Sequence, residues 1–166
     1  NPSHTYTNYS VNDTVYHMGL LATSEYGCQD TFIYHITVFA TPVAEFYATP
    51  TYQVYPSTTV DIDNQTDGVW DTHWTFGDDS ESDYVHPGNH VYDTWGEYDI
   101  SLFVSGDNCA DSLTHTIIID APPPEPAFEP NASGCAPFTV SFENNTLYAI
   151  AYEWNFGEGW IGSYIT

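Results

Sequence analysis

Four carboxylates crowd into one short stretch of the chain, the sequence GDDSESD at residues 77–83. Asp78, Asp79, Glu81 and Asp83 together offer oxygen ligands to a hard divalent cation, and Ca²⁺ takes about six to eight oxygens from such clusters. The spacing lacks the glycine and the terminal glutamate of an EF-hand loop. The pattern therefore predicts a calcium site of another type, and the alternative is a solvated turn that binds no ion.

The rest of the sequence carries no arrangement typical of catalysis. It lacks a Gly-x-Ser-x-Gly motif, a His-Glu-x-x-His motif, a glycine-rich phosphate loop and a Cys-x-x-Cys pair. Because it contains no lysine or arginine, an oxyanion or a phosphate would have to be held by backbone groups or a metal alone. We therefore expect a protein that is not an enzyme and that uses no cofactor beyond the calcium considered above.

The chain is strongly acidic and contains no lysine or arginine. It carries 23 acidic residues, no basic ones and a formal net charge of −23, where average usage would supply about twenty lysines and arginines. Nucleic-acid binding is excluded, because it depends on cationic groups that displace phosphate counterions. The composition favours divalent cations, cationic surfaces and neutral glycans as partners. The alternative is that the acidity only keeps the protein soluble and its strand edges apart. No apolar run approaches the ~20 residues of a membrane span, so no membrane insertion is expected.

The elements that carry these residues recur along the chain. WTFGDD at residues 74–79 returns as WNFGEG at 154–159, and the two tryptophans stand 80 residues apart (154 − 74). Two shorter pairs recur as well, at His4-x-Tyr6 and His90-x-Tyr92, and at Cys28-x-Asp30 and Cys109-x-Asp111. This self-similarity predicts an internal repeat.

The repeat divides the chain into three parts. These are the C-terminal part of one unit (1–41), a complete unit (42–120) and the N-terminal part of a third (121–166). A unit of ~80 residues is large enough to hold its own core, and the proline-containing boundaries FATPVAEF and DAPPPEPAF favour extended, stiff links. Because the chain starts and stops inside a unit, we expect an excerpt of a longer tandem array, arranged as beads on a string.

Within the complete unit, apolar residues alternate with a period of two. In YDISLFV, Tyr98, Ile100, Leu102 and Val104 share one face of an extended chain. Such alternation, interrupted by Gly, Pro, Asn and Asp, is typical of half-buried antiparallel strands. About six or seven short strands in ~80 residues predict an all-β, immunoglobulin-like β-sandwich.

The stretch WTFGDDSESDYVHPGNHVYDTWGEYDISLFV (74–104) resembles the signature of the PKD domain. In that family, Trp-x-Phe-Gly-Asp-Gly is followed by Pro-x-x-His-x-Tyr and then by Gly-x-Tyr-x-Val-x-Leu. Two positions depart from the pattern: Asp79 stands where the second glycine is usual, and Glu158 replaces the usual aspartate. If that glycine position needs a positive φ, aspartate is among the few residues that adopt it at modest cost.

The resemblance covers essentially the whole chain and implies a non-catalytic extracellular module. The pattern P-x-x-x-GC-x-P-x-TV-x-F is similar to repeats in very long surface proteins of gliding, type IX-secreting bacteria. Within the family motif, His4 and His90 are expected to hydrogen-bond a buried turn, with metal binding as the alternative. Some related domains bind calcium near their linkers, which makes Glu45 and Asp120 alternative ligands. The expected core residues, which recur at matched positions or lie on apolar strand faces, are Trp74, Phe76, Tyr92, Tyr98, Trp154 and Phe156.

Three cysteines fit a secreted protein with disulfides. Cys135 precedes a candidate second strand, and Cys28 and Cys109 lie in the loop before a last strand. If the last strand of a sandwich starts at the end that the first strand reaches, both cysteine positions of one unit meet at the same pole. We then expect Cys28 and Cys135 to be half-cystines with partners outside the chain. Cys109 is expected to be a free thiol, because Val54 or Tyr55 holds its partner position; three buried free cysteines are the alternative.

Two functions from different classes fit these observations. The first is a non-catalytic structural segment of a long secreted bacterial surface protein, an adhesin or extracellular filament related to gliding. Its expected partners are neighbouring repeats of the same chain, laterally associated copies, and glycans or cell surfaces. The second is a spacer or carbohydrate-contacting accessory module of a secreted hydrolase such as a chitinase or peptidase. Both functions place the protein outside the cell or on its surface.

Overall fold

The computed structural model describes residues 1–130, 133–157 and 160–165. The regular elements of these residues are all strands, so the predicted all-β class is confirmed. The strands are β1 (Thr14–Thr23), β2 (Gln29–Val38), β3 (Phe46–Thr49), β4 (Tyr52–Val54), β5 (Thr59–Asn64), β6 (Asp71–Thr75), β7 (Glu81–Ser82), β8 (Gly88–Val91), β9 (Gly96–Ser105), β10 (Ala110–Asp120), β11 (Phe128–Pro130), β12 (Phe142–Asn144), β13 (Ala151–Asn155) and β14 (Trp160–Ile165).

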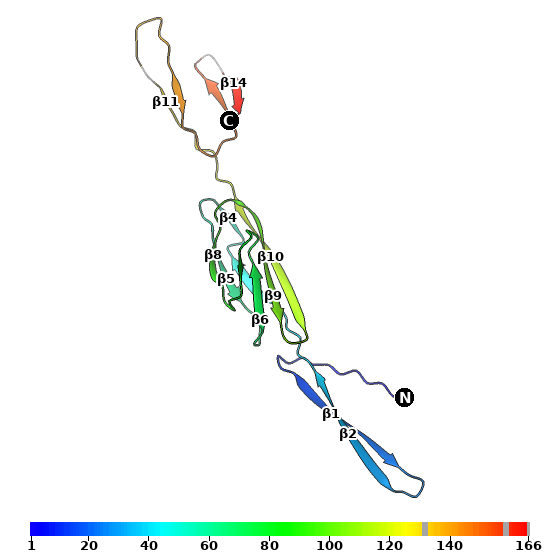
Figure 1. The fold of residues 1–166 in the computed structure, drawn as a ribbon. Coiled ribbons are helices and arrows are strands. Elements are labelled where there is room, and N and C mark those ends of the chain that lie inside the picture. Colours follow the sequence, from blue (N-terminus) through cyan, green and yellow to red (C-terminus); the bar gives the residue numbers. More distant parts are fainter. Residues whose placement is uncertain (131–132, 158–159, 166) are drawn as a thin grey trace.

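Strands β3 to β10 form two packed sheets, which we call the central sandwich (Figure 1). One sheet has the order β4-β10-β9-β6-β7 and the other the order β3-β5-β8. Along β9, every second residue from Tyr98 to Val104 is buried, as the alternation predicts. Phe46 of β3 and Val60 of β5 belong to the same core. The predicted immunoglobulin-like β-sandwich is therefore confirmed for this part of the chain.

The predicted core residues fall into two groups. Four are buried in the central sandwich: Trp74, Phe76, Tyr92 and Tyr98. The other two differ from the prediction, because Trp154 is only half-buried and Phe156 is 50% exposed. Both contact Phe142. However, the strands around them form two separate pairs, β11 with β12 and β13 with β14, and these pairs do not enclose them.

The chain enters and leaves the central sandwich at opposite ends. At the entrance, the Ala44 N–H donates to Oδ2 of Asp111 over 2.9 Å, close to the start of β10. At the exit, the end of β10 pairs in parallel with β4, which places Val54 opposite Asp120. We call the end near Ala44 the proximal pole and the end near Val54 the distal pole.

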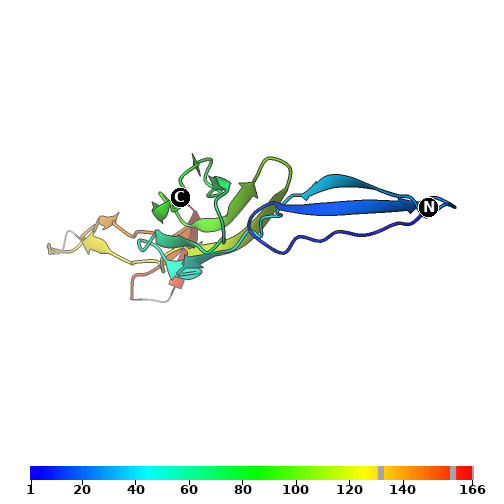
Figure 2. The ribbon, with the colours of Figure 1, turned by 90° about the horizontal axis from the view of Figure 1, so that it is seen from below.

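Two further segments flank the central sandwich, one at each pole (Figure 1). The N-terminal segment (residues 1–38) is a coil followed by the hairpin β1–β2, which is paired from Thr14↔Val38 to Thr23↔Gln29. Figure 2 shows this hairpin extending away from the sandwich with the N-terminal coil beside it. The C-terminal segment (residues 121–165) lies beyond the distal pole and holds strands β11 to β14.

Candidate functional site

The acidic stretch GDDSESD (77–83), which we call the acidic loop, contains the tight turn between β6 and β7 and β7 itself. Trp74 pairs with Ser82 across the two strands, so the residues between them reverse the direction of the chain. Two residues of the turn take a left-handed conformation, Gly77 with a φ of 83° and Asp79 with a φ of 66°. The expectation that Asp79 occupies a position with positive φ is confirmed.

Asp78 turns toward the sandwich. Its carboxylate accepts hydrogen bonds from the backbone N–H and the hydroxyl of Ser80, and its Oδ2 lies 2.7 Å from Nε2 of His90. The His90 ring stacks on Phe76 with centroids 4.2 Å apart, and the Tyr92 hydroxyl donates to the Phe76 carbonyl over 2.9 Å. The His-x-Tyr pair therefore closes a turn against the core, and the role predicted for His90 is confirmed.

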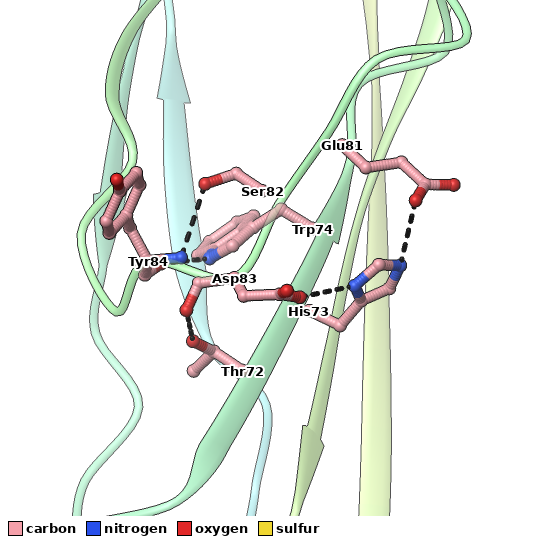
Figure 3. Close-up of polar contacts among 7 residues, drawn as sticks. All are labelled: Thr72, His73, Trp74, Glu81, Ser82, Asp83 and Tyr84. Atoms are coloured by element: carbon pink, nitrogen blue, oxygen red, sulfur yellow. Dashed lines mark hydrogen bonds and ion pairs between the residues drawn. The ribbon is translucent and has the colours of Figure 1, made fainter.

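Glu81 and Asp83 lie on the other side, beside the outer face of β6 (Figure 3). They flank the His73 ring, with Nδ1 2.7 Å from Oδ1 of Asp83 and Nε2 3.8 Å from Oε2 of Glu81. The hydrogen bond to Asp83 raises the pKa of His73. Nearby, the Trp74 indole N–H donates to the Tyr84 carbonyl over 3.0 Å and holds the loop backbone against the sandwich.

The structure does not bring the four carboxylates of the loop together, and calcium binding by them stays a prediction. Asp78 is engaged inside the turn, Asp79 is exposed, and Glu81 and Asp83 flank a histidine on the outer face. Among the described residues, no three His, Cys, Asp or Glu side chains gather where they could hold a metal ion. The physical reason is that a tight turn with two left-handed residues sends neighbouring side chains in different directions.

We expect Asp78 to make the fold sensitive to acid. Partial burial raises the pKa of this carboxyl, but the hydrogen bonds from Ser80 and His90 outweigh it and hold the pKa below its ordinary value. Such a group stabilises the fold above its unfolded pKa, near 3.8, and loses that contribution as the pH falls through the folded pKa. We expect Asp78→Asn to lower the free energy of unfolding by about 1–3 kcal/mol at neutral pH.

Urea unfolding at neutral pH and near pH ~3 measures this difference, which should shrink in acid. Asp79→Asn is the matched control, because Asp79 is exposed in the same turn and no hydrogen bond to its side chain is seen in the described part of the chain. A loss for Asp78→Asn that is the same at both pH values would contradict the role given to the ionised carboxylate.

The comparison with protein families decides what kind of module this is. A family model for the PKD domain matches residues 39–121, a span that begins before β3, ends after β10 and includes the whole turn cluster of Asp78, His90 and Tyr92. The chain belongs to the PKD domain family. PKD domains are typically extracellular, non-catalytic modules. No helix in the described residues is long and apolar enough to cross a membrane.

Comparisons with solved structures find distant likeness to this chain. No curated protein matches the chain. One similar solved structure comes from work on the promiscuous specificity of carbohydrate-binding modules of the β-sandwich superfamily, with 17% identity, a TM-score of 0.43, and coverage of 62% of this chain and 52% of that one. Another is the amphioxus IgVJ-C2 molecule, with 13% identity, a TM-score of 0.39, and coverage of 64% and 60%. The match thus spans between half and two thirds of the length of each structure.

The two cysteine positions of one PKD domain lie at opposite poles, which corrects the expected pairing within a unit. Val54 lies opposite Asp120 at the distal pole, whereas Cys109 immediately precedes β10 at the proximal pole. The 11 residues of β10 separate the two positions by roughly 35 Å at ~3.3 Å per residue, and a disulfide needs Cα atoms within about 7 Å. All three cysteines are free. Partners outside the chain for Cys28 and Cys135 remain a prediction.

Residues beside the two linkers of the PKD domain make hydrogen bonds within the fold. Asp120, one alternative calcium ligand, accepts a hydrogen bond of 2.7 Å from the Tyr52 hydroxyl at the distal pole. Glu45, the other, lies at the proximal pole beside Ala44. Sequence reasoning missed Asp111, whose carboxylate fastens the Ala44 N–H to the start of β10. The recurrence of Cys-x-Asp at two places in the sequence was the signal that could have identified this aspartate.

Proposed function

We propose that this chain is a non-catalytic structural segment of a long secreted bacterial surface protein, an adhesin or extracellular filament related to gliding. PKD domains follow one another in tandem along such a protein. The segment acts as a stalk that provides reach and passes a pulling force from one domain to the next. Its partners are neighbouring domains, laterally associated copies, and glycans or cell surfaces.

The observation that carries this proposal is the parallel pairing of β4 with β10. β4 follows the strand by which the chain enters the sandwich, and β10 is the strand by which the chain leaves. Tension between the two linkers therefore pulls β4 toward the proximal pole and β10 toward the distal pole. The two strands must slide past each other, so their hydrogen bonds are loaded together rather than one after another.

Hydrogen bonds outside the strand pairing also join β4 and its neighbours to β10. The Ile118 N–H donates to the Thr51 carbonyl over 2.9 Å, and the Tyr55 N–H donates to the Asp120 carbonyl over 3.0 Å. The Tyr52 hydroxyl adds its hydrogen bond to the Asp120 carboxylate. Hydrogen bonds on both sides of the parallel pairing extend the region that resists sliding under tension.

The strongly negative charge of the chain supports the proposed stalk role. The net charge of −23, without any basic residue, keeps neighbouring domains and chains apart in solution. The short edge strand β7 begins with Glu81 and is followed directly by Asp83, and charged side chains at a sheet edge oppose pairing with foreign strands. A long array of such sandwiches therefore stays soluble.

Single-molecule pulling tests the proposal. Handles are attached at residues 41 and 121 in one version, and at residues 41 and 107 in a second, with the three native cysteines replaced by serine. The first pair lies at opposite poles and shears β4 against β10, whereas the second pair lies at the proximal pole and peels β10 from its start. We expect a several-fold higher unfolding force for the first version. Equal forces, or a weaker first version, would overturn the stalk role.

A further inference from the structure

Two histidines face each other across the hairpin β1–β2. His17 of β1 and His35 of β2 are directly opposite in the strand pairing, and their rings meet edge-on with centroids 4.4 Å apart and an interplanar angle of 89°. Side chains that are directly opposite in an antiparallel pair lie on the same face of the sheet, with Cβ atoms about 4.5–5.5 Å apart. The two imidazoles therefore stand side by side on one face of the hairpin.

The ring nitrogens of both histidines are available as ligands. Both residues are exposed, and in the described part of the chain no hydrogen bond or ion pair to either ring is seen. By contrast, a ring nitrogen of His73 and one of His90 each lie 2.7 Å from an aspartate carboxylate. The pair of His17 and His35 thus differs from these two histidines, whose nitrogens already have partners.

The distance between the two rings suits a shared metal ion. A metal bound to both imidazoles at about 2.0–2.1 Å, with an angle of about 90–110° between the bonds, would place the ring centroids roughly 4.5–5.2 Å apart. The observed 4.4 Å is just below this range, so a small rotation of the two side chains brings one nitrogen of each ring to the metal. Gly19, the next residue on this face of β1, has no side chain and leaves space beside the pair.

The ligand type and the charge of the chain indicate which ion would bind. Imidazole nitrogen suits zinc, copper and nickel ions, whereas calcium and magnesium prefer oxygen ligands. The net charge of −23, without any lysine or arginine, attracts cations to the surface. Two protein ligands leave further coordination positions for water or an external ligand.

The face that carries the histidines is an outer face when both sheets of a sandwich are present. Aligning the two Cys-x-Asp pairs at the starts of β2 and β10 sets His17 and His35 against Asp99 and Thr116, which are also directly opposite each other. Asp99 and Thr116 are exposed on the central sandwich, and the Thr116 hydroxyl donates to Oδ1 of Asp99 over 2.6 Å. Side chains at these two positions therefore reach each other on a surface that the second sheet does not cover.

We propose that His17 and His35 form a binding site for a divalent transition metal ion of the class of Zn²⁺, Ni²⁺ and Cu²⁺. Each imidazole supplies one nitrogen, and water or an external ligand fills the remaining positions. The bound ion bridges β1 and β2 and fastens the two strands to each other. The site does not depend on the stalk role.

Calorimetric titration of the 166-residue chain with Ni²⁺ tests the site. The three free cysteines are replaced by serine, because thiolates also bind transition metals. Excess Ca²⁺ is present throughout and occupies carboxylates that attract hard cations. We expect one Ni²⁺ per chain. His17→Thr and His35→Thr should each weaken binding at least ~10-fold, since even changes to the partners of metal ligands cost about 10–100-fold in affinity.

Threonine favours strands, so these variants should keep the hairpin, which circular dichroism checks. His73→Ala is the matched control, because it removes an exposed histidine that already has carboxylate partners and should leave Ni²⁺ binding unchanged. Equal weakening by His73→Ala, unchanged binding in His17→Thr or His35→Thr, or loss of Ni²⁺ to excess Ca²⁺ would overturn the proposal.

Moving the pair to the central sandwich tests the geometry without altering the hairpin. Asp99→His combined with Thr116→His places two histidines at the matching positions of β9 and β10. This double variant should bind a second Ni²⁺, and a stoichiometry that stays at one would contradict the argument from register. In the parent chain, paramagnetic Ni²⁺ should broaden the NMR signals of the His17 and His35 rings before those of other histidines. Broadening that begins at another histidine would place the ion elsewhere and overturn the assignment.

Discussion

Replacing Trp74 by alanine should come close to unfolding the PKD domain. The Trp74 side chain is fully buried, packs edge-on against Phe46 at 5.1 Å and donates its indole N–H to the Tyr84 carbonyl. Its removal leaves a cavity between the two sheets and a carbonyl without that donor. Such a change typically costs about 3–5 kcal/mol, against a total stability of ~5–15 kcal/mol for a domain. The thermal midpoint should fall by roughly 15–30 °C in a scan of the full chain.

Trp95→Ala provides the comparison for this result. Trp95 is 44% exposed in the turn before β9, where it contacts Tyr55 and Tyr148. Because much of its ring already faces water, its loss should cost about 1 kcal/mol or less. Equal losses for the two variants, or a larger loss for Trp95→Ala, would mean that Trp74 does not anchor the core.

Gly77→Ala should be the second most damaging change. Gly77 has a φ of 83°, and a Cβ at this position would lie 2.8 Å from the backbone nitrogen of Asp99 and 3.0 Å from its carbonyl oxygen. The left-handed conformation alone costs alanine roughly 1–2 kcal/mol. The collision involves the backbone of the central strand β9, which cannot move aside as a side chain would. We expect a total loss of about 2–4 kcal/mol, measured by urea unfolding.

Gly88→Ala separates the two contributions. Gly88 has a similar φ of 73°, but a Cβ there would meet nothing within 4 Å. It should therefore show only the conformational cost of roughly 1–2 kcal/mol. If both glycine variants lose the same stability, the close approach of the loop to β9 does not contribute.

Local patterns in the sequence predicted a large part of this PKD domain. The period-two alternation from Tyr98 to Val104 identified the buried face of β9, because successive side chains of an extended strand point to opposite sides. The positive φ of Asp79 was likewise predictable, since the tolerance for that conformation belongs to the residue itself. The turn contact of His90 followed from a motif whose parts lie close together in the chain.

The tertiary structure alone decided how distant parts meet. It made β10 run parallel to β4, which separates Val54 from Cys109 by the length of a strand. It also turned Asp78 toward His90 while Asp83 faces His73, so carboxylates close in sequence form no common site. A strand pattern predicts which residues share a face, but it does not predict the direction in which the strand crosses the sheet. That direction depends on how the two sheets pack and on which strands become neighbours, and both are set by contacts between residues far apart in the chain.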